Sequence, residues 1–193
     1  MPPSLLLADL RAAFAARDVL RFGAADDAAA AVAAVLRTGP EGAEILLIRR
    51  ARREGDPWSG HVAFPGGKRD ATDTSLLATS IRETREEVGL TLDPSGLLAR
   101  LANVGAGGSA YPVAEFVFAI DDPLVSLRVN VEVEDAFWVP LRRIVEKQGK
   151  ETMTRIVAGE RVELPCVRLG EHVLWGMTHR MVMQIVAAAG AVE

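Results

Sequence analysis

The stretch FPGGKRDATDTSLLATSIRETREEVGL, residues 64–90, contains the clearest helical pattern in the chain. Within it, residues 74–89 place a set of apolar or small side chains on one face at helical spacing: Leu77, Ile81, Thr84 and Val88. Asp73 or Thr74 can cap the start of this segment, and Gly89 can end it. The sequence therefore predicts an amphipathic helix over residues 74–89, preceded by a glycine-containing loop.

Three glutamates of this helix, Glu83, Glu86 and Glu87, share the side opposite its apolar face. At about 100° per residue they lie within an arc of about 100°. Arg82 is one turn before Glu86 and can pair with it, whereas Arg85 lies toward the apolar edge, so much of the negative charge has no cationic neighbour. A solvated acidic face is one interpretation. The other, which we favour, is a site for a hard divalent cation such as Mg²⁺, which takes oxygen ligands.

Gly66 and Gly67 follow a predicted strand end, and their lack of a side chain lets a ligand or the helix approach the backbone. The loop lacks the G-x-x-x-x-G-K-[ST] spacing of a phosphate-binding loop. GAGGSA, residues 105–110, is not followed by the helix that a dinucleotide-binding fingerprint requires. We therefore exclude both of these nucleotide-binding motifs.

Length and composition predict one globular domain, residues 1–193. A net charge of -4 argues against general nucleic-acid binding. The N-terminal segment MPPSLLLADLRAAF fits neither a signal peptide nor a membrane span, so we expect a cytoplasmic protein without a membrane partner. Cys166 is the only cysteine, which excludes an intramolecular disulfide, and its neighbours predict a buried strand.

Residues 1–27 are expected to form a helical extension, because apolar residues recur at helical spacing over 5–14. Residues 28–38 are ambiguous: alanine favours helix, whereas the following GPEG and AEILLIRRA favour the first arm of a hairpin, and we predict a strand. The remaining elements are three strands and a closing helix, expected at residues 97–105, 112–120, 134–141 and 178–190. The predicted fold class is α+β.

The segment Gly67–Leu90, read as G-x5-D-x8-R-E-T-R-E-E-V-G-L, resembles the Nudix box of the Nudix hydrolases. The family pattern ends in R-E-U-x-E-E-x-G-U, where U is a bulky apolar residue, and Thr84 is its one mismatch in this chain. Upstream, Asp73 replaces the first glutamate of the pattern, with one extra residue before Arg82, as in the coenzyme A pyrophosphatase branch of the family. The resemblance implies the Nudix fold, a mixed β-sheet sandwiched between α-helices.

Three further segments are similar to that branch: residues 46–67, residues 132–141 with their Val-Pro-Leu ending, and residues 174–182 with Trp-Gly-x-Thr. Asp56 stands where the branch pattern has an arginine. The resemblance implies metal-dependent hydrolysis of the diphosphate of coenzyme A or its derivatives to 3',5'-ADP and 4'-phosphopantetheine or its acyl form. The alternatives are a Nudix hydrolase for another nucleoside diphosphate derivative (ADP-ribose, a dinucleotide or a nucleoside triphosphate) and a ligand-binding Nudix module without hydrolysis.

The resemblance also assigns roles to residues. Glu83, Glu86 and Glu87 would hold Mg²⁺ or Mn²⁺, and Arg82 would orient Glu86 and the preceding loop, pairing with Asp73. The general base would be a box glutamate or Glu132, so the implied catalytic set is Arg82, Glu83, Glu86 and Glu132. The residues expected to bind substrate are Arg49, Arg50, Arg52, Gly66 and Gly67, although a solvated strand end explains the arginines equally well. The expected partner is a small, coenzyme A-like nucleotide, and a homodimer is suggested only by analogy.

One aromatic residue near these arginines, Trp58, has two possible roles. It can stack on a nucleobase or cover the core, and we favour core packing.

Overall fold

The computed structural model describes residues 5–16, 28–56, 58–105, 112–157 and 159–190. Part of the predicted N-terminal extension, residues 17–27, and the GAGGSA segment beyond Gly105 lie outside this range. No helix in the part of the chain that the structure describes is long and apolar enough to span a membrane.

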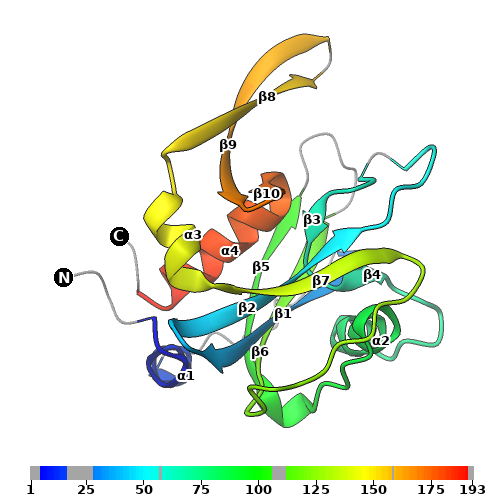
Figure 1. Cartoon of the computed structure of the whole chain (residues 1–193). Helices are drawn as coiled ribbons and strands as arrows, with labels where there is room; N and C mark the ends of the chain where they lie inside the picture. The colour runs from blue at the N-terminus through cyan, green and yellow to red at the C-terminus, as the bar shows by residue number, and fades with distance from the viewer. Residues whose placement is uncertain (1–4, 17–27, 57, 106–111, 158, 191–193) are drawn as a thin grey trace.

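A mixed seven-stranded sheet forms the centre of the molecule (Figure 1). Its main path has the order β3-β2-β1-β6-β5, with β4 paired to β1 and β7 paired to β2. The β1–β6 pair is parallel and the other pairs are antiparallel. The strands are β1 Ala30–Gly39, β2 Gly42–Arg50, β3 Val62–Ala63, β4 Gly66–Lys68, β5 Leu97–Gly105, β6 Pro112–Ala119 and β7 Val133–Pro140.

A second, three-stranded sheet projects from one end of the central sheet (Figure 1). Its strands are β8 Glu151–Val157, β9 Glu160–Leu169 and β10 His172–Trp175, in the order β10-β9-β8. Cys166 is a buried free thiol on β9, as the sequence predicted.

Helices cover both faces of the central sheet. The four α-helices are α1 Leu7–Ala16, α2 Leu76–Val88, α3 Leu141–Lys147 and α4 Gly176–Ala188, and η1, Pro94–Gly96, is a 3₁₀ turn. Buried residues of α2 join one core cluster, whereas those of α1, α3 and α4 join the other. The predicted α+β arrangement, a mixed sheet between helices, is confirmed (Figure 1).

The ambiguous alanine-rich segment is strand β1 and forms a hairpin with β2, as predicted. Its residues Ala31, Ala33 and Ala34 are fully buried in the middle of the sheet. Burial on both faces and pairing with neighbouring strands therefore outweigh the helix propensity of alanine.

Helix α2 differs from its prediction in two details. Ser75 is the N-cap and accepts a hydrogen bond from the Ala78 N–H, so neither Asp73 nor Thr74 caps the helix. Gly89 ends the helix in the left-handed conformation, as expected. The buried face is also shifted from the predicted one, and it comprises Leu76, Thr79, Ser80, Thr84, Glu87 and Val88.

Small hydroxyl residues explain how this polar face packs on the sheet. Thr84 Oγ1 donates to the Ser80 carbonyl at 2.7 Å, and Ser80 Oγ donates to the Leu77 carbonyl at 2.9 Å. Because the helix's own carbonyl groups satisfy these hydroxyls, they can be buried without a partner on the sheet.

Candidate active site

Glu87 is the most buried of the three helix glutamates, at 2% exposure. Its Oε2 accepts a hydrogen bond from the backbone N–H of Gly66 on β4 at 2.8 Å. Burial raises the pKa of Glu87 to about 7; the Gly66 hydrogen bond and the charge of Arg50 oppose this shift, and the charges of Glu83 and Glu132 add to it. The prediction that Glu87 lies opposite the buried face is therefore wrong, because the glycine strand supplies a donor that lets the carboxylate enter the helix–sheet contact.

Glu83 lies one helical turn earlier and is packed against Gly67. A Cβ atom at position 67 would be 2.5 Å from Glu83 Cδ, so only glycine leaves room for this carboxylate. Burial raises the pKa of Glu83, an effect that Arg82 opposes. The two glycines thus have different tasks, since Gly66 donates a hydrogen bond to one carboxylate and Gly67 makes space for the other.

Arg82 connects the acidic groups to the loop, and its predicted pairing with Asp73 and Glu86 is confirmed. Its Nε and Nη2 each donate to one oxygen of Asp73, both at 2.9 Å. Its Nη1 lies 2.9 Å from Glu83 Oε1 and 3.0 Å from Glu86 Oε2. The hydrogen bonds from Arg82 hold the pKa of buried Asp73 well below its ordinary value. Asp73 therefore anchors the arginine, which in turn orients Glu83 and Glu86.

The donor set of this site suits a divalent cation. Within the described residues, no three His, Cys, Asp or Glu side chains are already grouped as a metal cage. Mg²⁺ nevertheless needs only one or two protein carboxylates, with water and substrate phosphates as its other ligands. Glu83 and Glu87 fit this requirement, because burial raises the pKa of Glu87 and the charge of Glu83 adds to it, and a cation would offset both effects. Glu86, with 54% of its side chain exposed, lies at the rim.

Glu132 and Arg50 approach the same carboxylates from outside the helix. Glu132 precedes β7, and its charge contributes to the raised pKa of both Glu83 and Glu87. Its Oε1 lies 3.0 Å from Arg53 Nη1. Arg50 is at the end of β2, and its Nη2 lies 3.1 Å from Asp56 Oδ2. The structure therefore brings Glu132 and Arg50 close to the glutamates, as the sequence analysis expected.

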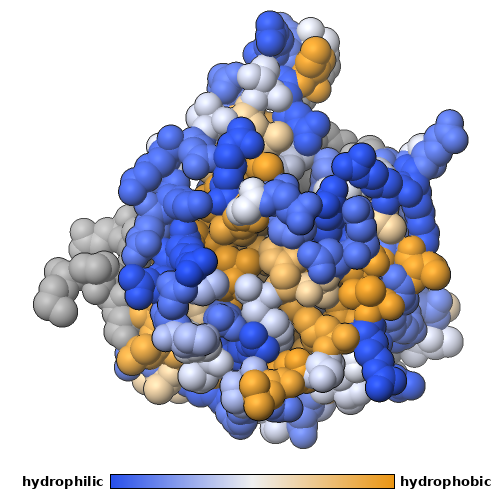
Figure 2. Space-filling view, in the orientation of Figure 1, coloured by the Kyte–Doolittle hydropathy of each residue, from blue (hydrophilic) through white to orange (hydrophobic). Residues whose placement is uncertain are grey.

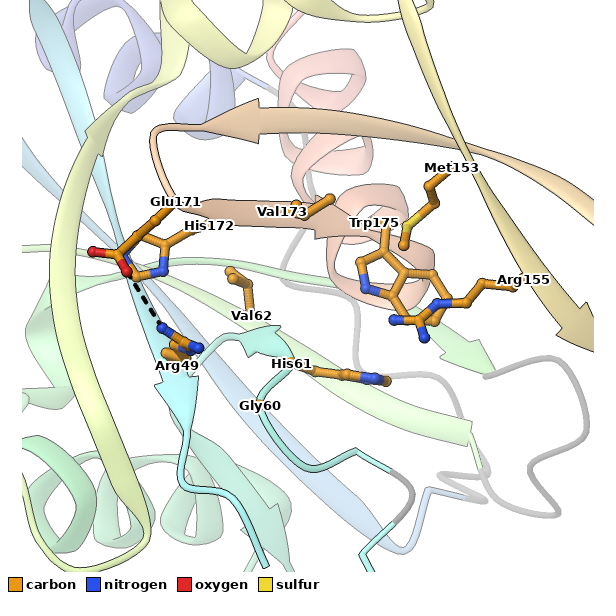
Figure 3. Close-up of a pocket in the computed structure, with 10 residues that line it drawn as sticks. All are labelled: Arg49, Gly60, His61, Val62, Met153, Arg155, Glu171, His172, Val173 and Trp175. Atoms are coloured by element: carbon orange, nitrogen blue, oxygen red, sulfur yellow. Dashed lines mark ion pairs between the residues drawn. The ribbon is translucent and has the colours of Figure 1, made fainter.

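The four arginines of residues 49–53 do not form one cluster. Arg49 lies 3.4 Å from Glu134 and 3.7 Å from Glu171, and it lines a separate pocket (Figure 3). Arg52 is exposed. Successive strand residues point to opposite faces, which separates Arg49 from Arg50.

Trp58 is 49% exposed and belongs to neither core cluster, so the favoured prediction of core packing is wrong. Its backbone N–H donates to Asp56 Oδ1 at 3.0 Å. Trp58 thus lies in a turn at the surface.

Metal-free protein should lose stability as the pH rises. Glu87 has a pKa of about 7 in the folded state against 4.5 when unperturbed, so its stabilising contribution is complete below about 4.5 and is lost as the pH rises through 7. The loss amounts to about 3 kcal/mol. We expect urea unfolding in a chelator to give a lower free energy of unfolding at pH 8 than at pH 5.

The Glu87→Gln variant distinguishes the effect of Glu87 titration on stability from the effects of other titrating groups. Burial lowers the pKa of His61 and His179, and these histidines change stability in the opposite direction over the same range. The difference between wild-type and Glu87→Gln unfolding free energies should therefore change with pH. If the two pH curves run parallel, Glu87 does not titrate as stated.

Comparison with known proteins identifies the family. Residues 27–158, well over half of the chain, match the profile of the NUDIX domain. The chain belongs to the Nudix family. The family resemblance of residues 67–90 is thereby confirmed, and the carboxylate site described above lies within this Nudix domain.

Two relatives are similar to this Nudix chain over most of its length. Mitochondrial coenzyme A diphosphatase NUDT8 of Homo sapiens is 33% identical over 138 residues, which cover 69% of this chain and 58% of the human protein. The Nudix hydrolase NudL of Photorhabdus laumondii is 30% identical over 141 residues, covering 72% of this chain and 74% of that protein. The chain thus spans less than two thirds of the human relative.

Solved structures support the Nudix fold. A MutT/nudix family protein from Enterococcus faecalis superimposes with a TM-score of 0.56 at 16% identity, covering 94% of this chain and 68% of that one. A NUDIX hydrolase from Alicyclobacillus acidocaldarius gives a TM-score of 0.55 at 22% identity, covering 86% and 94%. At these identities the likeness concerns the fold alone.

Proposed function

We propose that this Nudix protein is a metal-dependent pyrophosphohydrolase that cleaves the diphosphate linkage of coenzyme A or its derivatives. The products would be 3',5'-ADP and 4'-phosphopantetheine or its acyl form. The observation that carries the hydrolase proposal is the placement of Glu83 and Glu87 against Gly66 and Gly67. The similarity to a coenzyme A diphosphatase supports the choice of substrate.

Mg²⁺ or Mn²⁺ would be held by Glu83 and Glu87, with Glu86 as a further ligand. Bound metal would neutralise phosphoryl oxygens and make a water more nucleophilic. Arg82 positions Glu83 and Glu86, and its Nη2 also donates to the Lys68 carbonyl at 3.3 Å, which ties the helix to the glycine strand. The chain itself thus supplies a rigid frame for the reacting groups.

Hydrolysis consumes one water. Its oxygen bonds to a phosphorus of the diphosphate, the bridging P–O bond breaks, and a carboxylate accepts the water proton. Glu132 is a candidate acceptor because it is near both Glu83 and Glu87 but lies outside the helix, where its salt bridge with Arg53 is solvent-exposed. A box glutamate is the other candidate.

A second substrate class is favoured by Asp56. This residue pairs with Arg50, so one arginine near the carboxylates is already partly neutralised. A less highly charged diphosphate, such as ADP-ribose, would need fewer free cations than coenzyme A does. A Nudix module without hydrolysis has less support, because all three box glutamates are present.

A substrate panel with mass identification of products tests the proposal. We expect coenzyme A and acetyl-coenzyme A to be hydrolysed faster than ADP-ribose, a diadenosine polyphosphate or a nucleoside triphosphate, and only with Mg²⁺ or Mn²⁺ present. Much faster turnover of ADP-ribose would contradict the choice of substrate. Glu87→Gln prepared in parallel controls for a contaminating hydrolase.

Three expectations from the sequence stay predictions: a cytoplasmic location, homodimer formation, and the absence of nucleic-acid binding.

A further inference from the structure

A separate pocket lies between β3 and the second sheet, with a volume of about 180 Å³ (Figure 3). It is lined by residues from β2, the turn before β3, β8 and β10, including Arg49, His61, Arg155, His172 and Trp175. None of the glutamates of the candidate active site lines it. Its lining combines two guanidinium groups with aromatic rings.

Arg155 is the cation of this pocket that forms no ion pair with a carboxylate among the described residues. Its guanidinium lies 4.5 Å from the centre of the Trp175 ring, and it forms no ion pair with any residue in the described ranges (Figure 3). By contrast, Arg49 has two acidic neighbours, although one of them, Glu171, is 79% exposed and 3.7 Å away. Stacking thus holds the guanidinium of Arg155 at the pocket while its hydrogen-bond donors stay available for an anion.

His172 adds an unused polar atom. Its ring stacks on Phe137 at 4.0 Å, and its Nε2 lies 3.3 Å from Asp135 Oδ2. Its Nδ1 is buried and has no hydrogen-bond partner in the described parts of the chain. Stacking on Phe137 and the contact with Asp135 therefore fix the His172 ring in the wall of the pocket.

The pocket and the candidate active site are close enough for one substrate. His61 at the pocket and Gly66 beside Glu87 are five residues apart, so their Cα atoms are separated by at most about 18 Å. Arg50 is near both sites, because its charge contributes to lowering the pKa of both Glu87 and His61. A substrate of the size of coenzyme A is long enough to cover this separation.

Figure 2 shows mainly hydrophilic side chains over the projecting second sheet, with a hydrophobic group near its tip, where Ile156 is exposed. A neutral pantetheine arm would gain little from Arg155, whereas a phosphate monoester can accept charge-assisted hydrogen bonds from a guanidinium. We propose that this pocket binds the 3'-phosphate on the ribose of coenzyme A, the group that distinguishes this nucleotide from ADP-ribose. The inference rests on the proposed function and names a specificity site for it.

Arg155→Gln tests this assignment with two substrates, coenzyme A and 3'-dephospho-coenzyme A. We expect the KM for coenzyme A to rise about tenfold with little change in kcat, as for the loss of a charge-assisted hydrogen bond. The KM for the dephospho compound should stay within about twofold, since it lacks the recognised group. Arg155→Lys, which keeps the charge, should give a smaller rise.

Arg161→Gln is the matched control, because Arg161 is an exposed arginine of the same hairpin that does not line the pocket. It should leave both KM values unchanged, and equal melting temperatures should show that all variants fold. The assignment would be overturned if Arg155→Gln changed the KM values for both substrates equally or left both unchanged. It would also be overturned if the variant affected only coenzyme A thioesters with acidic acyl groups. If the wild-type protein hydrolyses neither substrate, the proposed function fails instead.

Discussion

Glu87→Gln is expected to lower the turnover of the diphosphate substrate by about 10²–10⁴-fold while the fold stays intact. Glutamine has the same size, and its side-chain oxygen can still accept the Gly66 N–H that now binds Glu87 Oε2. The substitution removes the negative charge that we assign to metal binding. We therefore expect this variant to lose activity while it keeps its fold.

Three measurements define the result. Steady-state kcat at saturating Mg²⁺ or Mn²⁺ reports the chemical step, and calorimetric titration of the metal reports the lost ligand. Urea unfolding without metal should show no loss of stability at pH 8, because the variant no longer buries a carboxylate with a pKa of about 7. A wild-type turnover rate would remove the metal role assigned to Glu87.

Glu115→Gln is the matched control. Glu115 on β6 is fully buried, and neither carboxylate oxygen has a hydrogen-bond partner in the described residues. Burial raises its pKa well above the ordinary value, so it shares the electrostatic character of Glu87 without belonging to the candidate site. We expect unchanged turnover for this variant. An equal loss in both variants would indicate that the activity responds to any change in a buried carboxyl group.

Local signals allowed much of the site to be predicted from the sequence. Helix α2, its end at Gly89 and the pairing of Arg82 with Asp73 depend on residues close together in the chain, and the structure contains all of them. The β1–β2 hairpin was recognised for the same reason, because its turn residues lie between the two strands. Such features follow from backbone preference and short-range spacing.

The burial of Glu87 could not be predicted in this way. A helical projection assigns faces by the polarity of the helix residues alone, and it placed Glu87 with the exposed carboxylates. The deciding partner is the N–H of Gly66, which β4 presents after pairing with β1. The glycine pair in the sequence indicates a close contact with the backbone. Which helix residue makes that contact depends on how the helix packs on the sheet.

Only one strand of the second sheet, around Cys166 on β9, was predicted from the sequence, whereas β8 and β10 were not. Much of β8 and β9 is exposed, and their pairing joins residues such as Thr154 and Glu163 across a hairpin. The pocket that combines Arg155 with Arg49 depends on this non-local arrangement. The separation of Arg49 from Arg50 could have been predicted from the sequence, since the side chains of successive strand residues point to opposite faces of the sheet.

Gly66→Ala is expected to lower the free energy of unfolding by more than about 3 kcal/mol, because an added Cβ meets backbone that cannot move aside. At position 66 the Cβ would be 2.6 Å from Val32 Cα and closer still to the Ala31 carbonyl oxygen. Both atoms belong to β1 in the middle of the sheet, so relief of the contact would separate β4 from β1. Urea unfolding, or loss of folded protein on expression, would measure the effect.

Gly67→Ala is the neighbouring control that distinguishes packing from chemistry. Its Cβ would contact the carboxylate end of Glu83, a flexible group that can move away. We expect a loss of stability of only about 1 kcal/mol but a large fall in turnover, because the displaced Glu83 no longer lies beside Glu87. Wild-type stability of Gly66→Ala would contradict the close β1–β4 contact, and wild-type turnover of Gly67→Ala would show that the observed position of Glu83 is not needed for hydrolysis. The opposite outcomes would establish that two adjacent glycines serve the fold and the reaction separately.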